Sequence, residues 1–122
     1  MKGKVKFRFE DFEIWTQAVM VSDELFAIAS DLASLKKYRF SEQLNAATLS
    51  ITNNIAEGSG SVSDKDFANF LNISRRSLFE CANMIAILER NGVVDSQKKI
   101  ELFEKLDHLS SMITNFRKRL TK

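Results

Sequence analysis

Apolar residues recur along most of the chain at alternating spacings of four and three residues. This spacing places them on one face of an α-helix, and its repetition over several turns is typical of helices that pack side by side. From this periodicity we expect an all-α protein with more than about 70% of its residues in helices.

Polar residues mark the ends of the first two helices. Asp11 is a good N-cap residue, and the helix that it begins runs to about residue 32. Ser41 is expected to cap a second helix, which runs to about residue 57. Gly58 then fits the position just after the helix, where the chain turns in a left-handed conformation.

The last two helices carry similar signals. Ser63 with Asp66 three residues later resembles a capping box, and Asn91 followed by Gly92 ends the third helix. Asp95 or the next residue caps a fourth helix that continues to about residue 120. Short loops between four such helices favour an antiparallel up-down-up-down four-helix bundle, built as a single domain over residues 1–122. Residues 1–9 form a basic segment that is extended, disordered or packed on a neighbouring chain.

Two of the helices carry more apolar surface than one packing partner requires. The first has two apolar stripes, and the third has a second stripe beside its main seam. Soluble monomers seldom expose a large apolar patch, so we predict a homo-oligomer. The predicted interface consists of Ile14, Ala18, Val21, Leu25, Phe70, Ile73, Met84 and Ile87.

Composition fits a globular protein that can form long helices. The 122 residues include no proline and only four glycines, and 44% are hydrophobic. The single cysteine, Cys81, lies in an apolar seam and is expected to be inert, while the single histidine, His108, is expected on the surface. We therefore expect no catalytic residues, cofactor or metal site, and no enzymatic activity. No run of about 20 apolar residues and no secretory signal is present, so we expect a cytoplasmic protein that does not bind a membrane.

Charge is unevenly distributed, although the formal net charge is only +2. Residues 10–33 carry six acids and no base, whereas both ends of the chain are basic. In an antiparallel bundle the two basic ends meet, and they would form a basic rim able to contact phosphates. The tail bases could instead complement the negative end of the fourth helix. The candidate nucleic-acid contacts are Lys2, Lys4, Lys6, Arg8, Arg117, Lys118 and Arg119.

A polar group near the end of the second helix has two interpretations. Asn54 and Glu57 are three residues apart and share a helix face. They could be ordinary solvent-facing residues beside a turn. They could also form a network that joins the second helix to the third through Ser77 or Glu80.

Several short segments resemble a known family. They are residues 12–15 (Phe-Glu-Ile-Trp), 54–58 (Asn-Ile-Ala-Glu-Gly), 67–71 (Phe-Ala-Asn-Phe-Leu) and 77–80 (Ser-Leu-Phe-Glu). Together they resemble the four-helix bundle proteins, also called the 23S rRNA intervening-sequence protein family. The resemblance implies a homopentamer. It also implies a similarity to the accessory variability proteins of diversity-generating retroelements, which are basic pentameric barrels that bind nucleic acid and a reverse transcriptase.

Two functions remain open from the sequence. The first is a non-enzymatic oligomeric scaffold or adaptor that contacts RNA, or an RNA-handling protein, through the basic rim. The alternative is a structural or protein-interaction oligomer with no role in nucleic-acid binding. Members of the family often have arginines at the positions of Asn45 and Ala46. This chain therefore lacks positive charge at these two positions, which favours the alternative.

Overall fold

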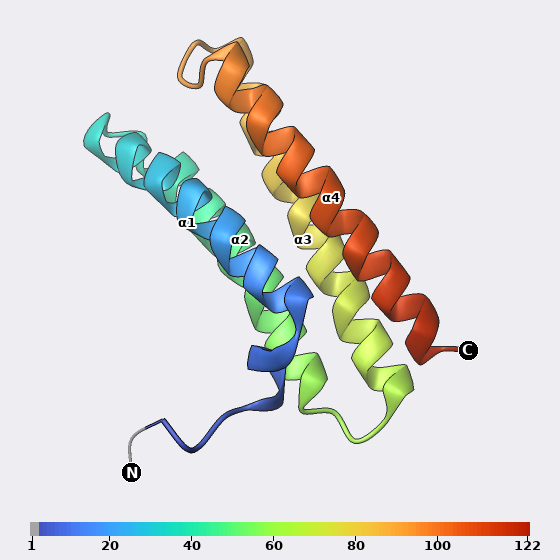
Figure 1. Ribbon diagram of the computed structural model, residues 1–122. Helices are drawn as coiled ribbons and strands as arrows, with labels where there is room; N and C mark the ends of the chain where they lie inside the picture. The colour runs from blue at the N-terminus through green and yellow to red at the C-terminus, as the bar shows by residue number, and fades with distance from the viewer. Residues whose placement is uncertain (1–2) are drawn as a thin grey trace.

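The computed structural model describes residues 3–122, which form one short 3-10 turn and four α-helices (Figure 1). The turn η1 (Arg8–Asp11) is followed by α1 (Glu13–Ser34), α2 (Tyr38–Ser59), α3 (Asp64–Arg90) and α4 (Ser96–Leu120). Successive helices run in opposite directions, 83% of the protein is helical, and the described residues contain no strand. The predicted all-α four-helix bundle and its helical content are confirmed.

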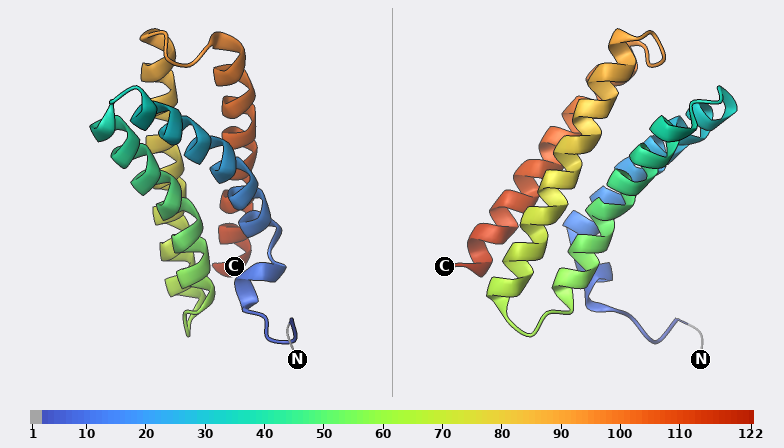
Figure 2. Two further views of the ribbon diagram at one scale, coloured as in Figure 1. Left: turned by 90° about the vertical axis from the view of Figure 1, so that its left-hand side faces the viewer. Right: turned by 180° about the vertical axis from the view of Figure 1, so that it is seen from behind.

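The four helices form two hairpins, α1–α2 and α3–α4. The hairpins diverge toward the end that holds the α1–α2 and α3–α4 turns (Figures 1 and 2). Contact between helices is most extensive for α2 with α3 and least for α1 with α4. At the opposite end the beginning of α1 meets the end of α4, where the rings of Phe12 and Phe116 lie 5.1 Å apart. The two ends of the described chain therefore lie at the same end of the bundle.

The core contains apolar side chains from all four helices. Burying each large aliphatic or aromatic side chain contributes roughly 1.5–3 kcal/mol. The largest fully buried ones are Phe67, Leu25, Leu32, Leu44, Ile51, Ile55, Leu71, Ile85, Leu88, Leu102, Leu106 and Leu109.

Most of the predicted oligomer interface lies inside this core. Ile14, Ala18, Val21 and Leu25 are at most 4% exposed, and Met84 is also buried. The prediction that these five residues form an interface between copies is wrong. The physical reason is that α1 packs against both α2 and α4, so the chain itself covers the apolar stripe that contains Ile14, Ala18, Val21 and Leu25.

Two predicted helix starts are also wrong. Asp11 belongs to η1, and Phe12 occupies the N-cap position of α1 without a side-chain hydrogen bond. Helix α2 begins at Tyr38, three residues before Ser41, after a turn in which Lys36 adopts a φ of +63°. Ser41 is buried, and its hydroxyl donates a 2.7 Å hydrogen bond to the Ala29 carbonyl. Ser41 thus joins α2 to α1.

The predicted caps of α3 and α4 are confirmed. The Ser63 hydroxyl accepts a 3.1 Å hydrogen bond from the backbone N–H of Asp66. The Asp95 carboxylate accepts one of 2.7 Å from the N–H of Lys98. At the other end of α3, Gly92 has a φ of +75°, a conformation that glycine adopts at little cost.

Gly58 has a different function from the one predicted. It lies inside α2, which continues to Ser59, and the cap residue is Gly60 with a right-handed φ of −87°. A Cβ atom on Gly58 would lie 2.7 Å from the Cβ of Phe70 and 2.8 Å from a ring carbon of Phe67. The missing side chain therefore permits the first turns of α3 to approach the end of α2.

Among the described residues, the helices lack an apolar stretch long enough to cross a bilayer.

Candidate functional site

The predicted basic residues that the structure describes gather at one end of the bundle, but two of them, Arg8 and Arg117, bind backbone carbonyls of the chain itself. The Arg8 guanidinium donates to the Ser59 carbonyl at 3.1 Å and lies over the rings of Phe12 and Phe67. The Arg117 side chain donates to the Ala68 carbonyl at 3.0 Å. These arginines hold η1 to the end of α2 and the end of α4 to the beginning of α3.

Few of the other predicted basic contacts lack a partner within the described chain. Lys6 forms a 2.9 Å ion pair with Asp11, and the Arg119 guanidinium lies over the ring of Phe116. Lys4 and Lys118 form no ion pair within residues 3–122, while Lys2 lies outside the described residues. Five acids lie in η1 and in the first turns of α1 and α3 at the same end: Glu10, Asp11, Glu13, Asp64 and Asp66. This end has mixed charge and is not a uniformly basic rim.

A polar network joins α2 to α3, but it contains only Asn54 and Ser77 of the four predicted members, together with Ser50. The Asn54 amide donates to the Ser50 carbonyl at 2.7 Å and to the Ser50 hydroxyl at 2.9 Å. The hydroxyls of Ser50 and Ser77 share a 2.7 Å hydrogen bond. The side chains of Glu57 and Glu80 are exposed and make no hydrogen bond within the described chain, so their assignment to the network is wrong.

Sequence reasoning missed Ser50, which is the centre of this network. Its spacing of four residues before Asn54 is the signal that could have identified it, because side chains at this spacing meet on a helix. Further polar contacts continue along the same pair of helices. The Ser74 hydroxyl donates to the Ile51 carbonyl at 2.7 Å, and the Thr48 hydroxyl lies 3.6 Å from the Cys81 sulfur. We call the α2–α3 seam the set of all these polar contacts, from the Asn54–Ser50–Ser77 network to the Thr48–Cys81 contact, together with Gly58.

Cys81 is buried in the α2–α3 seam. Burial raises the pKa of its thiol to about 11, so the sulfur is protonated at neutral pH. A protonated, buried thiol is a poor nucleophile, and Cys81 therefore acts as a small packing residue.

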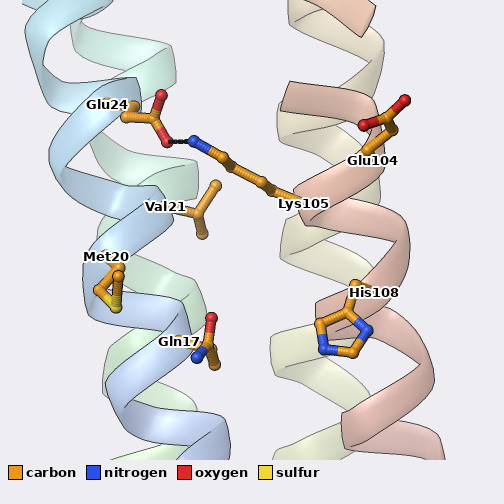
Figure 3. Close-up of a pocket in the computed structure, with 7 residues that line it drawn as sticks. All are labelled: Gln17, Met20, Val21, Glu24, Glu104, Lys105 and His108. Carbon is orange, nitrogen blue, oxygen red and sulfur yellow. Dashed lines mark hydrogen bonds and ion pairs between the residues drawn. The ribbon is translucent and has the colours of Figure 1, made fainter. Parts of the chain in front are cut away.

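A groove of about 290 Å³ lies between α1 and α4, where these helices diverge (Figure 3). Glu24 spans it and pairs with Lys98 at 2.7 Å and with Lys105 at 2.6 Å. Hydrogen bonds from Lys105 and Lys98 lower the pKa of this carboxyl. Gln17 and His108 line the groove from its two sides. The described residues contain no group of three or more side chains suited to hold a metal ion.

The outer face of α3 carries apolar side chains that the fold leaves uncovered. Ile73 is 43% exposed and Ile87 is 38% exposed, and Phe70 is half-buried in line with them. We call these three residues the α3 stripe. Phe40 of α2, itself 38% exposed, lines a groove between α2 and α3 together with Met84.

Residues 10–115 match a family described as 23S rRNA-intervening sequence protein. The chain belongs to this family. The membership predicted from the sequence motifs is thereby confirmed, and the matched region contains the α2–α3 seam and the α3 stripe. Residues 3–9 and 116–122 lie outside it, and they include every candidate nucleic-acid contact that the structure describes.

A crystal structure determined at 1.70 Å resolution shares the fold of this 23S rRNA-intervening sequence protein. It is a protein of unknown function from the S23 ribosomal protein family of Bacteroides thetaiotaomicron. The two are 19% identical, with a TM-score of 0.81 over 86% of this chain and 98% of the other. No curated protein is significantly similar in sequence. The relation to the accessory variability proteins of retroelements stays a prediction.

The roles of Asn54 and Glu57, the two predicted network members on α2, can be distinguished by substitution. Asn54→Ala removes both hydrogen bonds to Ser50 and should lower the free energy of unfolding by about 1–2 kcal/mol. Glu57→Ala, three residues away on the same helix, should change it by less than about 0.5 kcal/mol, because Glu57 is exposed and unpaired in the described chain. Urea unfolding midpoints measure both values. Equal losses would contradict the assignment of Asn54, and not Glu57, to the network.

Proposed function

We propose that this 23S rRNA-intervening sequence protein is a non-enzymatic helical scaffold that assembles with copies of itself. The observation that carries this proposal is the α3 stripe. It lies on the longest helix that the structure describes, of 27 residues, where Ile73 and Ile87 are exposed in line with the half-buried Phe70. Five copies is the number that the family resemblance implies.

The α3 stripe is long enough to pack against several turns of another helix. Residues 70 and 87 are separated by about 26 Å along the helix axis, since each residue adds about 1.5 Å. The polar contacts of the α2–α3 seam hold α3 in place, so the stripe is presented on a rigid element. A preformed apolar surface loses little conformational entropy when it binds, which favours association. A second copy of this chain is always present at the same concentration, and most soluble oligomers are closed assemblies of identical chains. In a ring of five copies, the α3 stripe would pack against a different surface of the neighbouring copy.

The assembly is tested by placing a charge in the α3 stripe. Ile73→Glu and Ile87→Glu should each shift the mass measured by light scattering toward the 13.9 kDa of one chain, because a buried unpaired carboxylate disfavours the interface. Leu49→Glu is the matched control. Leu49 is 50% exposed on α2 and lies two residues before the buried Ile51, so it faces away from the core and from the α3 stripe.

Circular dichroism should show that all three variants keep their helical content. A wild-type protein that remains a 13.9 kDa monomer at micromolar concentration would contradict the proposal. Stripe variants that assemble like wild type would contradict the assignment of the surface.

Contact with RNA is the second candidate function. Three bases at one end of the bundle favour it, because Lys4, Lys118 and Arg119 are exposed and have no carboxylate partner among the described residues. An assembly would repeat these charges in each copy. The neighbouring acids limit this site to weak contacts with phosphates, without recognition of bases.

RNA contact is measured by the fluorescence anisotropy of a labelled unstructured RNA at about 50 mM salt, where such binding is strongest. Replacing Lys118 and Arg119 together with alanine should weaken binding equally for different RNA sequences. The control, Lys36→Ala with Lys37→Ala, removes the same charge at the opposite end of the bundle and should leave binding unchanged. If wild type does not bind under these conditions, the scaffold has no RNA-binding function.

A further inference from the structure

The exposed side of α3 has a regular spacing along most of its length. Exposed residues follow one another at intervals of four and three, and Ile73 and Ile87 occupy equivalent places in this repeat. Such spacing is typical of a helix that packs against another helix nearly parallel to it. We call these exposed residues the α3 row: Asn69, Ile73, Arg76, Glu80, Asn83, Ile87 and Arg90. The α3 row contains the two exposed members of the α3 stripe and adds charged groups beside them.

The α3 row is cationic. Arg76 and Arg90 are exposed and form no ion pair within the described part of the chain. The acid of the row, Glu80, lines a groove together with Arg39 of α2. Two copies of this row packed against each other would bring like charges together, which disfavours association. A surface of opposite charge is therefore the better partner for the α3 row.

Helix α1 exposes such a surface. No base lies between residues 10 and 33, and Asp23 and Asp31 are exposed acids on this helix. Among residues 3–122, neither of them forms an ion pair. The nearby lysines of α4, Lys98 and Lys105, both pair with Glu24 instead. The two aspartates are thus available to a cation from outside the chain.

The exposed side of α1 also has room for bulky side chains. Met20 is 58% exposed, and the exposed neutral residues around it are small. Small residues on one helix allow the larger residues of another to pack between them. We call this surface the α1 face: Thr16, Met20, Asp23, Ala27, Ser30, Asp31 and Ser34.

The position of Asp31 is unfavourable in a single copy. It lies in the last turn of α1, where the helix dipole is negative, and this turn contains no base. Lys36 and Lys37 follow in the next turn of the chain, but neither forms an ion pair with Asp31. A cation supplied by a neighbouring molecule would relieve this repulsion.

The α3 row and the α1 face lie on opposite sides of the bundle. Helices α1 and α3 are diagonal, because each packs against α2 and α4 and the two make no contact with each other in the described structure (Figure 2). One copy can therefore present its α3 row to one neighbour and its α1 face to another. The two surfaces cannot meet within one chain.

The charges also correspond in their position along the bundle. Helices α1 and α3 run in the same direction, and at their shared end the rings of Phe12 and Phe67 lie 5.8 Å apart. Counted from these two rings, Asp23 lies 11 residues along α1 and Arg76 lies 9 residues along α3. Since each residue of a helix adds about 1.5 Å, the two charges differ in level by about 3 Å.

The second pair of charges gives a similar result. Asp31 lies 19 residues from the ring of Phe12, and Arg90 lies 23 residues from the ring of Phe67. Their levels differ by about 6 Å. Copies related by rotation about an axis along the bundle stay at the same level. In such an arrangement each acid of the α1 face has an arginine of the α3 row close to its own level.

We propose that the α3 row of one copy packs against the α1 face of the next copy, with Arg76 opposite Asp23 and Arg90 opposite Asp31. The contact is head to tail, because it joins two different surfaces. Contacts of this kind close into a ring when the rotation between neighbours divides a full turn. This inference rests on the self-assembly proposed above, and it names the surface on which the α3 stripe packs.

Exchanging the charges of the two surfaces tests the inference. Asp23→Lys with Asp31→Lys reverses the charge of the α1 face, and Arg76→Glu with Arg90→Glu reverses that of the α3 row. Each pair places like charges opposite each other, so the mass measured by light scattering at micromolar concentration should shift toward the 13.9 kDa of one chain. All four substitutions in one chain restore opposite charges and the wild-type net charge. This combined variant should recover the wild-type mass.

The matched control is Glu104→Lys with Asp107→Lys. It changes the net charge as much as the α1 pair does, at exposed residues of α4 outside both surfaces, and it should assemble like wild type. Circular dichroism should show wild-type helical content for every variant, because all the replaced side chains are exposed.

Two results would overturn the inference: an α1 variant that assembles like wild type, or a combined variant that stays dissociated. If wild type assembles and the α3 variant alone dissociates, only the placement on α1 is wrong, and the α3 row packs on another surface, such as the α3 row of a second copy. If wild type is a monomer, both this inference and the proposed self-assembly are wrong.

Discussion

The close approach of α2 and α3 is the constraint on which the rest of this structure depends. At the end of α2, Gly58 provides space for Phe67 and Phe70, whose atoms lie where its Cβ would be. Further along, small hydroxyl-bearing residues keep the helices close and satisfy their own polar groups, as Ser74 does by donating to the Ile51 carbonyl. Buried polar groups cost free energy unless they are paired, so these contacts also fix the relative position of the two helices.

The opposite side of the bundle is held differently. Helices α1 and α4 diverge, and Glu24 joins them through Lys98 and Lys105. Ion pairs near the surface contribute little to stability and are screened by salt, whereas the α2–α3 seam is buried. The two hairpins are therefore joined firmly along α2 and α3 and loosely along α1 and α4. This asymmetry is why α3 presents its outer stripe rigidly, while the groove that Glu24 spans lies on the open side between α1 and α4.

The periodic spacing of apolar residues was sufficient to predict the number, order and packing of the helices, because that spacing reflects burial directly. Local capping chemistry correctly placed the starts of α3 and α4, where Ser63 and Asp95 bind their own backbone. It failed where a polar residue binds another helix, as Ser41 does with Ala29. The stripe of α1 that contains Ile14, Ala18, Val21 and Leu25 was wrongly assigned to an interface between copies, because the sequence indicates burial on two sides but not whether the covering helices belong to the same chain. Arg8 and Arg117 likewise appeared as free charges, since their carbonyl acceptors are far away in sequence.

The central claim, that the α2–α3 seam holds the bundle together, is tested most directly at the two glycines beside it. Gly58→Ala should lower the free energy of unfolding by about 1–3 kcal/mol, the cost of adding a methyl group to a filled space. Gly60→Ala should leave it unchanged or slightly raised, because the nearest atom to its added Cβ is 3.4 Å away and its φ suits alanine. Urea unfolding of the two variants beside wild type gives both values. Equal stabilities for Gly58→Ala and Gly60→Ala would contradict the claim.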